Sequence, residues 1–402
     1  MIRGIAMELQ DLRTPCYIVN EDDYKKNIEE LMEAYNSRWP GTVIYGYSVK
    51  TNHLPYMAKI AYNMGWLIEV VSPDEYEFAK VCGANETEII YNGPQKRDSV
   101  IDAIIAGSIV NLDNLMEVEL VCSNASKVSK SNSRIGIRIN FNLESDCPGE
   151  TTCRDTVGRF GICYENGDVK KALNLLKEAG IKLSGIHLHS SSSSRSTNIF
   201  RAISKKAIQV INEFELYDID YIDIGGGFFG GNLFPGKPTV QQYAEVICNT
   251  LKEGLGQEKC KSIKLILEPG AAILATSMDY LVSVLNIRNI RGERIVTVDG
   301  SVIHVNPMMN PHETPCTIIN PGEETMIKQI VGGSTCMEMD RLWPRNLHQL
   351  VEMNTQLLFH ACGAYMSTHN SSFINAAPNI YVKKDGEYSY LRRKNIESMM
   401  KY

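Results

Sequence analysis

The segment VIYGYSVKTN at residues 43–52 places Lys50 directly after an apolar run that is rich in β-branched and aromatic residues. Such a run predicts a buried strand over residues 42–49, with Lys50 at its carboxyl end. Three later segments, GIHLHS at 185–190, YIDIGGGF at 221–228 and LILEPG at 265–270, also end an apolar run with polar or glycine residues. Because α/β barrels keep their chemistry at the carboxyl ends of parallel strands, the four segments predict one shared site.

Alternating helix-like and strand-like segments extend from about residue 23 to residue 275. Helices are expected at 21–35 and 54–63, and strands at 42–49, 67–71, 88–91, 109–112, 135–140, 183–189, 221–224 and 265–268. Repeated βα units predict a parallel sheet. Periodicity does not distinguish an open sheet from a closed one, but functional groups at the ends of many strands favour an α/β barrel over a single crevice.

The chain has 402 residues, which is more than the roughly 250 residues of a typical barrel, so a second domain is expected. After residue 275 the pattern changes to short strand-like runs, at 280–285, 294–298, 325–331 and 388–392, that glycine, proline and asparagine interrupt. We therefore expect a barrel over residues 23–275 and a β-rich domain formed by residues 1–22 and 276–402.

The composition limits the partners. The net charge is −6 and the basic residues are spread along the chain, so neither nucleic acid nor a membrane is expected as a partner, whereas a small molecule or a second copy is. The 11 cysteines lack C-x-x-C spacing, which is typical of reduced intracellular thiols. The first residues lack a long apolar region and no stretch of about 18 apolar residues occurs, so we expect a cytoplasmic protein.

His187 and His189 are two residues apart, so on a strand both point the same way. A metal site is one alternative, but no carboxylate follows nearby in the sequence, and a stacking or structural role is favoured over a metal. The serines at 190–194 are either a flexible linker or a source of hydroxyl and N–H groups for phosphate oxygens.

Each of three features also has a non-functional interpretation. Lys50 could be a surface lysine, Glu268 a surface glutamate, and the glycines at 225–227 a tight turn. The functional alternatives are an amine held for Schiff-base chemistry, a carboxylate that keeps a pyridine nitrogen protonated, and a turn whose N–H groups bind an anion. The glycine spacing is not the dinucleotide-binding fingerprint G-x-G-x-x-G.

Eleven short segments occur together in one order: TPCYIV, YSVKTN, EVVSPDE, YNGPQK, RIN, RFGI, HLHSSS, DIGGGF, EPG, GGSTCMEMD and GAY. In this the chain resembles the pyridoxal-phosphate decarboxylases of the alanine-racemase-like fold, the family of diaminopimelate and ornithine decarboxylases. The resemblance covers residue 14 to the end and implies a (β/α)8 barrel followed by a C-terminal β-rich domain.

The resemblance also implies a set of residues that bind pyridoxal 5′-phosphate. Lys50 would bond to the cofactor covalently, His189 would stack on its ring, and Glu268 would pair with the pyridine nitrogen. Further cofactor-binding residues would be Ser192, Gly226, Gly227 and Gly270, with Tyr365, Glu69 and Arg138 in support.

Cys336 matches a cysteine that, in this family, lies at a dimer interface and protonates the substrate Cα in the partner's site, so catalysis would need a homodimer with shared sites. A thiol with a pKa of about 8.5 is mostly protonated at neutral pH and can act in this way. Arg159 and Asp340 match a charge pair that bridges the subunits.

The chain departs from the family pattern at the positions that would contact the substrate. Ala271 stands where many members have an arginine after EPG, and Arg195 is a candidate to replace it. Met337, with Glu338 one place later, stands at the family's substrate-reading acid, and Asn310 and Pro311 replace its usual contacts. His304, His312 and Glu313 are other polar groups of that segment, each also explained as solvated or structural.

The resemblance implies the decarboxylation of an α-amino acid, with Lys50, His189 and Cys336 as catalytic residues. An amino-acid racemase of the same fold is the enzymatic alternative, and EPG together with a donor cysteine argues against it. A regulator without activity and a carrier of the cofactor are the alternatives from another class. The altered substrate segment leaves open whether the substrate is diaminopimelate, a polyamine precursor or a larger, modified amino acid.

Overall fold

The computed structural model describes residues 7–153, 156–230, 235–308, 313–344, 347–366, 368–369 and 372–400. The chain divides into two compact units. One consists of Met1–Asn27, Gly231–Leu233 and Ile273–Tyr402, and the other of Ile28–Gly230 and Phe234–Ala272. Each unit is described below by itself.

The larger unit is a closed parallel barrel, as predicted. Its strands are β2 (Val43–Ser48), β3 (Leu67–Val70), β4 (Ile89–Tyr91), β5 (Ile109–Leu112), β6 (Arg134–Asn140), β8 (Gly185–His187), β9 (Tyr221–Asp223) and β10 (Lys264–Leu267). Each pairs in parallel with the next, β5 pairs directly with β6, and β10 pairs with β2, which closes the ring. The short β7 (Ile162–Cys163) pairs with β6 outside the ring.

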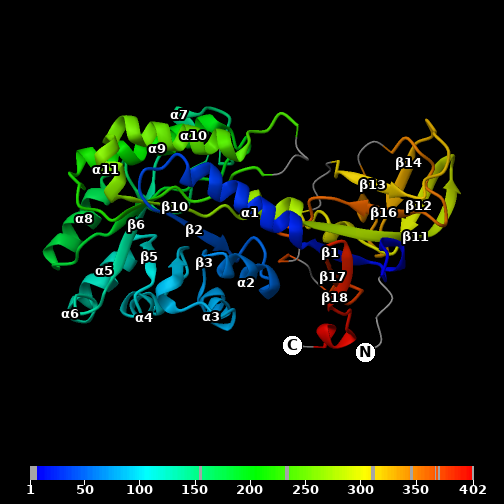
Figure 1. Cartoon of the computed structure of the whole chain (residues 1–402), viewed down its shortest axis with the longest axis horizontal. Coiled ribbons are helices and arrows are strands. Elements are labelled where there is room, and N and C mark those ends of the chain that lie inside the picture. The colour runs from blue at the N-terminus through cyan, green and yellow to red at the C-terminus, as the bar shows by residue number, and fades with distance from the viewer. Residues whose placement is uncertain are drawn as a thin grey trace. The chain divides into compact units, whose positions relative to one another are not determined.

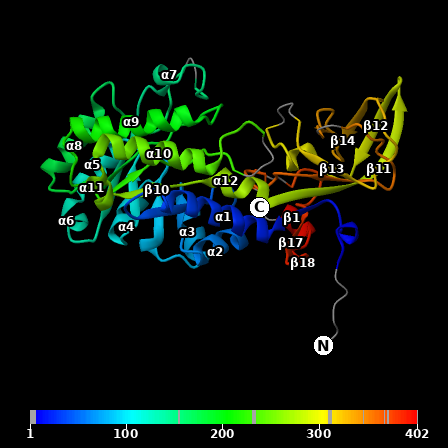
Figure 2. The same ribbon diagram turned by 45° about the horizontal axis from the view of Figure 1, so that its top comes forward.

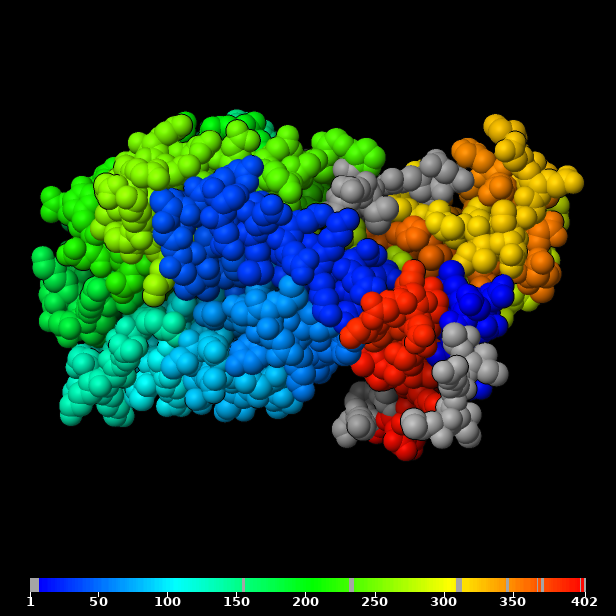
Figure 3. All heavy atoms as spheres, viewed as in Figure 1, coloured from blue at the N-terminus to red at the C-terminus, as the bar shows by residue number. Residues whose placement is uncertain are grey.

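Helices surround the barrel, and Figure 1 shows the strands enclosed by them. They are α1 (Glu21–Asn36), which begins in the smaller unit, α2 (Pro55–Asn63), α3 (Pro73–Val81), α4 (Ser99–Ile105), α5 (Leu115–Ser123), α6 (Ala125–Val128), α7 (Leu143–Asp146), α8 (Asp168–Glu178), α9 (Thr197–Glu213), α10 (Val240–Leu255), α11 (Gln257–Ser262) and α12 (Gly270–Leu274). Figure 3 shows the same face of this unit with all heavy atoms as spheres, coloured by residue number.

The smaller unit is built on a mixed sheet. Its strands are β1 (Cys16–Asn20), β11 (Met278–Ile290), β12 (Glu293–Val298), β13 (Cys316–Ile319), β14 (Gln329–Gly332), β15 (Arg341–Leu342), β16 (Gln356–Phe359), β17 (Asn379–Lys384) and β18 (Glu387–Arg392). Their order is β15-β14-β12-β11-β1-β17-β18, and β16 joins β11 to β13. The turned view of Figure 2 shows β11 and β12 as long neighbouring arrows.

The expected strand at residues 325–331 begins only at Gln329, so that part of the prediction is wrong. Thr325 instead lies in a loop, where its backbone N–H donates to the His348 carbonyl oxygen. None of the helices in the described part of the chain is both long and apolar enough to cross a membrane.

The barrel interior is arranged in two layers. Successive inward positions of a strand are two residues apart, and on five strands an apolar or aromatic residue is followed two positions later by a polar one. The pairs are Leu67 and Glu69, Ile90 and Asn92, Ile109 and Asn111, Tyr221 and Asp223, and Ile266 and Glu268. The lower layer is an apolar cluster, and the upper one, which we call the polar layer, lies toward the carboxyl ends of the strands.

Candidate functional site

Lys50 follows β2, and its amine forms an ion pair with Glu69 on the neighbouring strand β3. The distances from Lys50 Nζ to the two Glu69 oxygens are 2.8 and 3.0 Å. Ser48 Oγ also donates to Glu69 Oε2, at 2.6 Å. The Glu69 side chain is fully buried whereas that of Lys50 is 38% exposed, so the ion pair joins a buried carboxylate to a partly exposed lysine.

Glu268 lies at the end of β10 and is connected to Glu69 by an asparagine that was not singled out in the sequence. Asn92 Nδ2 donates to Glu268 Oε1 at 2.5 Å and to Glu69 Oε1 at 3.2 Å. The Asn92 oxygen accepts from Asn111 Nδ2 at 2.9 Å. One amide group therefore fixes the distance between the carboxylate that holds Lys50 and the carboxylate of Glu268.

Asp223, at the end of β9, is the third buried carboxyl group of the polar layer. It accepts from Gly225 N–H at 2.8 Å and from Asn111 Nδ2 at 3.2 Å, and one of its oxygens lies within 4.8 Å of an oxygen of Glu268. Burial is the main reason that the pKa of Asp223 rises to about 7 and that of Glu268 rises well above its usual range.

His187 and His189 lie with nearly parallel rings, whose centroids are 6.4 Å apart. Within the described residues, neither ring nitrogen of the buried His187 has a hydrogen-bond partner, although its Nε2 lies 3.9 Å from Glu268 Oε2. Burial lowers the pKa of both rings, that of His189 to about 3, so both are neutral. The fold thus brings carboxyl groups to His187 that are remote from it in the sequence.

The glycine turn after β9 packs tightly against this group. Gly226 N–H donates to His189 Nδ1 at 3.3 Å. A side chain at Gly225 would place its Cβ 2.6 Å from that of His189, and one at Gly226 would come within 2.0 Å of the Glu268 carbonyl oxygen. Gly227 has a φ of +95°, which favours glycine. The turn therefore needs glycine for steric reasons, whatever it binds.

Arg138 on β6 lies behind His189. Its Nη2 donates to the His189 carbonyl oxygen at 3.2 Å, and its Nη1 contacts Asp113 Oδ1 at 3.4 Å. Asp113 N–H donates to Glu117, which pairs at 2.9 Å with the fully buried Lys96. Lys96 belongs to the segment YNGPQK but was assigned no role from the sequence; it anchors a second charge network that ends at His189.

Ser192 lies in a loop that is bound to Glu150. Its hydroxyl donates to the Glu150 carbonyl oxygen at 3.0 Å and accepts from Arg195 N–H at 2.9 Å. Ser194 and Ser196 donate to the Glu150 carboxylate. The serine run is thus an ordered loop with several internal bonds rather than a flexible linker.

Arg195 and Gly270 complete the candidate residues of the barrel unit. The Arg195 guanidinium stacks on Phe229, with Cζ 4.8 Å from the ring centroid, and its carbonyl oxygen accepts from Tyr243. A Cβ on Gly270 would lie 2.2 Å from Thr51 Oγ1, so glycine is required beside the segment that carries Lys50.

The remaining candidates lie in the smaller unit, where Cys336 and Glu338 are exposed, Met337 is partly buried and Tyr365 is 38% exposed. Asp340 accepts from Val302 N–H and from both donors of Thr335, so its carboxylate holds the loop before Cys336. Arg159, in the barrel unit, is exposed and stacks on Phe160. Asn310, Pro311 and His312 lie outside the described residues.

Of the other polar residues in the substrate segment, Glu313 is exposed and His304 is buried. Tyr280 OH lies 2.6 Å from His304 Nδ1, and Tyr17 OH donates to the His304 carbonyl oxygen at 2.8 Å. Burial lowers the pKa of His304 to about 4. His304 is therefore part of the core of the smaller unit, which agrees with its structural interpretation.

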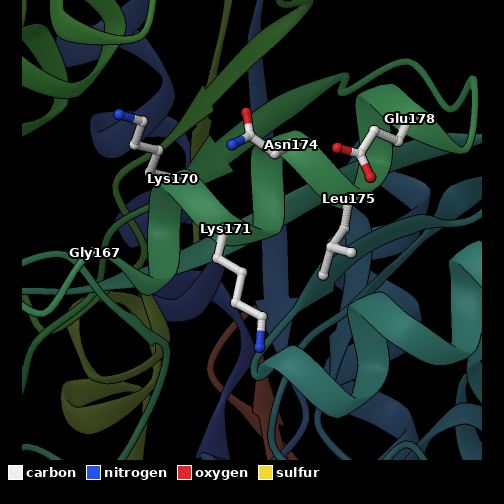
Figure 4. A pocket seen from close by; sticks show the side chains of 6 residues that line it. All are labelled: Gly167, Lys170, Lys171, Asn174, Leu175 and Glu178. Carbon is white, nitrogen blue, oxygen red and sulfur yellow. The ribbon is translucent and has the colours of Figure 1, made fainter.

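A depression on the outer face of α8 lies apart from these residues. It is lined by Gly167, Lys170, Lys171, Asn174, Leu175 and Glu178. Figure 4 shows the side chains of Lys170 and Lys171 pointing in different directions, so their amines do not converge on one ligand. None of these residues belongs to the polar layer, and we assign no role to the depression.

Comparisons with known proteins connect this arrangement to one group of enzymes. Residues 25–275 match the family described as "Pyridoxal-dependent decarboxylase, pyridoxal binding domain". A probable chloroplastic diaminopimelate decarboxylase of Oryza sativa is 24% identical over 97% of this chain and 79% of its own length. Diaminopimelate decarboxylase of Methanocaldococcus jannaschii is 26% identical over 90% of this chain and 84% of its own. The crystal structure of the latter enzyme superposes with a TM-score of 0.84 and 22% identity, covering 98% of this chain and 92% of that one.

Proposed function

Because the chain belongs to the family of pyridoxal-dependent decarboxylases, which act on α-amino acids, we propose that its polar layer and glycine turn bind pyridoxal 5′-phosphate and that its substrate is related to diaminopimelate. The observation that carries the proposal is the position of Lys50: its amine is paired with Glu69 at the end of β2, and Glu69 is joined through Asn92 to the buried carboxyl of Glu268.

The residues fit this cofactor in three respects. The amine of Lys50 suits an aldehyde, the buried Glu268 suits a protonated ring nitrogen, and the glycine turn offers the N–H of Gly227 to an anion. Within the described part of the chain, both ring nitrogens of the buried His187 and the Nε of Arg138 lack a hydrogen-bond partner. When bound, pyridoxal phosphate supplies an electron sink for the charge that develops at the substrate Cα as carbon dioxide leaves.

Glu69 and Lys50 act together in this scheme. The carboxylate holds the amine at the end of β2, so the amine meets an aldehyde in a fixed orientation. Ser48 and Asn92 hold Glu69 in turn, which leaves Glu69 little freedom to follow the amine away from the layer.

His189 and Arg138 form one wall of the proposed site. The His189 ring is fixed by the N–H of Gly226 and by its own backbone bond to Arg138, and it is neutral. A neutral, flat ring in a fixed orientation is suited to stack on an aromatic cofactor, because it brings no charge that would oppose protonation of the pyridine nitrogen.

For the phosphate we propose Ser192, Gly226 and Gly227, with Arg195 in place of the arginine that Ala271 replaces. Arg195 has no carboxylate partner among the described residues, and its backbone is held by Ser192 and Tyr243. Arg195→Ala should weaken binding of pyridoxal phosphate or of substrate, and unchanged affinity for both would refute this role.

Cys336, Tyr365 and the pair of Arg159 and Asp340 stay predictions that follow from the family resemblance. We propose that Cys336 donates the proton to the substrate Cα and that the enzyme is a homodimer whose subunits share their sites. The exposure of Cys336 is compatible with a partner that brings it to another site. The free state of all 11 cysteines supports a cytoplasmic location.

Mass spectrometry of an amino-acid panel that includes diaminopimelate, incubated in D₂O with the protein and pyridoxal phosphate, tests the proposal. Loss of carbon dioxide with the gain of one deuterium is the expected result. Lys50→Ala should abolish both, whereas Lys170→Ala, a lysine on α8, should leave both unchanged. Deuterium gained without loss of mass would instead indicate a racemase, and diaminopimelate left intact while another amino acid reacts would refute the proposed substrate.

A further inference from the structure

Asp223, which lies beside Glu268, has no part in the roles proposed so far. The two residues end neighbouring strands, β9 and β10, and are 0% and 5% exposed. A carboxyl oxygen of each and a ring nitrogen of His187 all lie within 4.8 Å of one another. Because two buried carboxylates this close repel each other, the ionisation of one opposes that of the other, which favours one retained proton on the pair.

The other hydrogen bonds determine which carboxyl carries the proton. Asp223 accepts from two N–H donors, Gly225 and Asn111, whereas Glu268 accepts from one, Asn92. Because N–H donors stabilise the ionised form of a carboxyl group, Asp223 is the better carboxylate and Glu268 the carboxyl that more readily keeps a proton.

Charged and titratable groups from the neighbouring strands surround the pair. Glu69 on β3 adds negative charge, Lys50 and Arg138 add positive charge, and His187 is neutral because burial lowers its pKa. Tyr221, two residues before Asp223, is occupied as a donor to Asn111 at 2.8 Å. None of these neighbours accepts a hydrogen bond from a protonated Glu268. Asp223 is therefore the group that would accept it.

We propose that Asp223 is a positioning residue that holds Glu268 ready for the ring nitrogen by sharing one proton with it. In the cofactor-free protein the proton is on Glu268, which donates to Asp223. When Glu268 pairs as a carboxylate with a protonated ring nitrogen, the proton moves from Glu268 Oε to Asp223 Oδ. No proton enters or leaves, and the pair keeps a net charge of −1. This second half of the proposal rests on the proposed function.

Infrared titration of the C=O stretch of protonated carboxyl groups tests the first half on the cofactor-free protein. In the unmodified protein, a buried protonated carboxyl should persist at pH 8. In Asp223→Asn its acid dissociation constant should rise at least tenfold, because Glu268 loses both its acceptor and a negative neighbour. In Glu268→Gln, whose amide can still donate a hydrogen bond to Asp223, the remaining Asp223 should titrate near pH 7, its value in the pair. An unchanged titration of Glu268 in Asp223→Asn would overturn the proposal.

A matched control is Glu75→Gln, because burial also raises the pKa of Glu75 to about 7. This substitution should remove only its own signal. Addition of pyridoxal phosphate then tests the second half: the unmodified complex should retain one protonated buried carboxyl, and the Asp223→Asn complex should retain none. Loss of that signal from the unmodified complex would overturn the transfer. Absence of any absorbance change with the cofactor would overturn the proposed function as well. The titration of the cofactor-free protein would still test whether Asp223 and Glu268 share one proton.

Discussion

Replacing Lys96 by methionine should destabilise the barrel unit more than most single changes, because it leaves a carboxylate buried without its cation. The side chain of Lys96 is 0% exposed and that of Glu117 is 8% exposed, and 2.9 Å separates their charged atoms. The amine also donates to the Gly93 carbonyl oxygen at 2.5 Å. Methionine fills a similar volume, so the substitution removes charge and hydrogen bonds with little change in packing.

The expected cost follows from what each partner retains. Breaking a buried ion pair by removing one partner costs about 3–5 kcal/mol. Glu117 keeps one donor, the N–H of Asp113 at 2.8 Å, which places the cost of Lys96→Met near the lower limit, at about 3 kcal/mol. Lys96→Met combined with Glu117→Leu removes both charges, so the double variant should be more stable than Lys96→Met alone, with a coupling energy of about 2–3 kcal/mol.

Urea-induced unfolding at pH 7, followed by circular dichroism, measures the free energy of unfolding of the four proteins in this cycle. Lys170→Met is a matched control, because this lysine lies on the surface helix α8 and should change stability by less than about 0.5 kcal/mol. If Lys96→Met is as stable as the control, or if the two single effects simply add in the double variant, the buried pair does not stabilise the unit in the way the geometry implies.

Three further predictions follow from single contacts. Gly226→Ala should weaken pyridoxal phosphate binding at least tenfold in an absorbance titration, because its Cβ would lie 2.0 Å from the Glu268 carbonyl oxygen, whereas Gly158→Ala, with its nearest neighbour at 3.5 Å, should not. Tyr221→Phe should lower the free energy of unfolding by about 1–3 kcal/mol, because it leaves the buried Asn111 oxygen without its donor; an unaltered urea midpoint would contradict this. Burial raises the folded-state pKa of Glu75 from 4.5 to about 7, so its ionisation destabilises the fold progressively as the pH rises from 4.5 to 7. Glu75→Gln should therefore be more stable than the unmodified protein above pH 7, by about 1–3 kcal/mol. This difference should vanish near pH 4.

The barrel could be predicted from the sequence because its strands are short apolar runs that end at a charged residue or a proline. Residues 42–49 and 265–268 end before Lys50 and Pro269; the observed β2 lies within the first range, and β10 begins one residue before the second and ends at Leu267. The order of the motifs allowed several candidates to be placed at strand ends; Glu69 and Glu268 do lie in one polar layer, and Lys50 pairs with Glu69. In the smaller unit the expected strand at 325–331 was misplaced, because the short apolar runs there alternate with loops that have backbone bonds of their own.

The amides of the layer were not predicted, although the sequence contains a signal for them. Asn92 and Asn111 each stand two residues after an isoleucine, which is the spacing of successive inward positions on a strand. Asparagine is uncommon at inward positions of a strand, so a polar residue two places after an apolar one indicates an inward polar layer. Which carboxyl each amide contacts could not be read in this way, because that depends on the register between strands.

The amides explain how three buried carboxyl groups coexist at the end of one barrel. Among the described residues, Glu69 alone of the three has a cation at hydrogen-bond distance, namely Lys50, and that amine is the group proposed to bond to the cofactor. Asn92 and Asn111 donate to Glu69, Glu268 and Asp223 without adding charge, and a shared proton removes one negative charge from the pair. A cation in place of either amide would hold Glu268 ionised through a permanent partner and would compete with a ring nitrogen for it. Neutral donors and a shared proton instead leave Glu268 able to form its ion pair only when a protonated ring arrives.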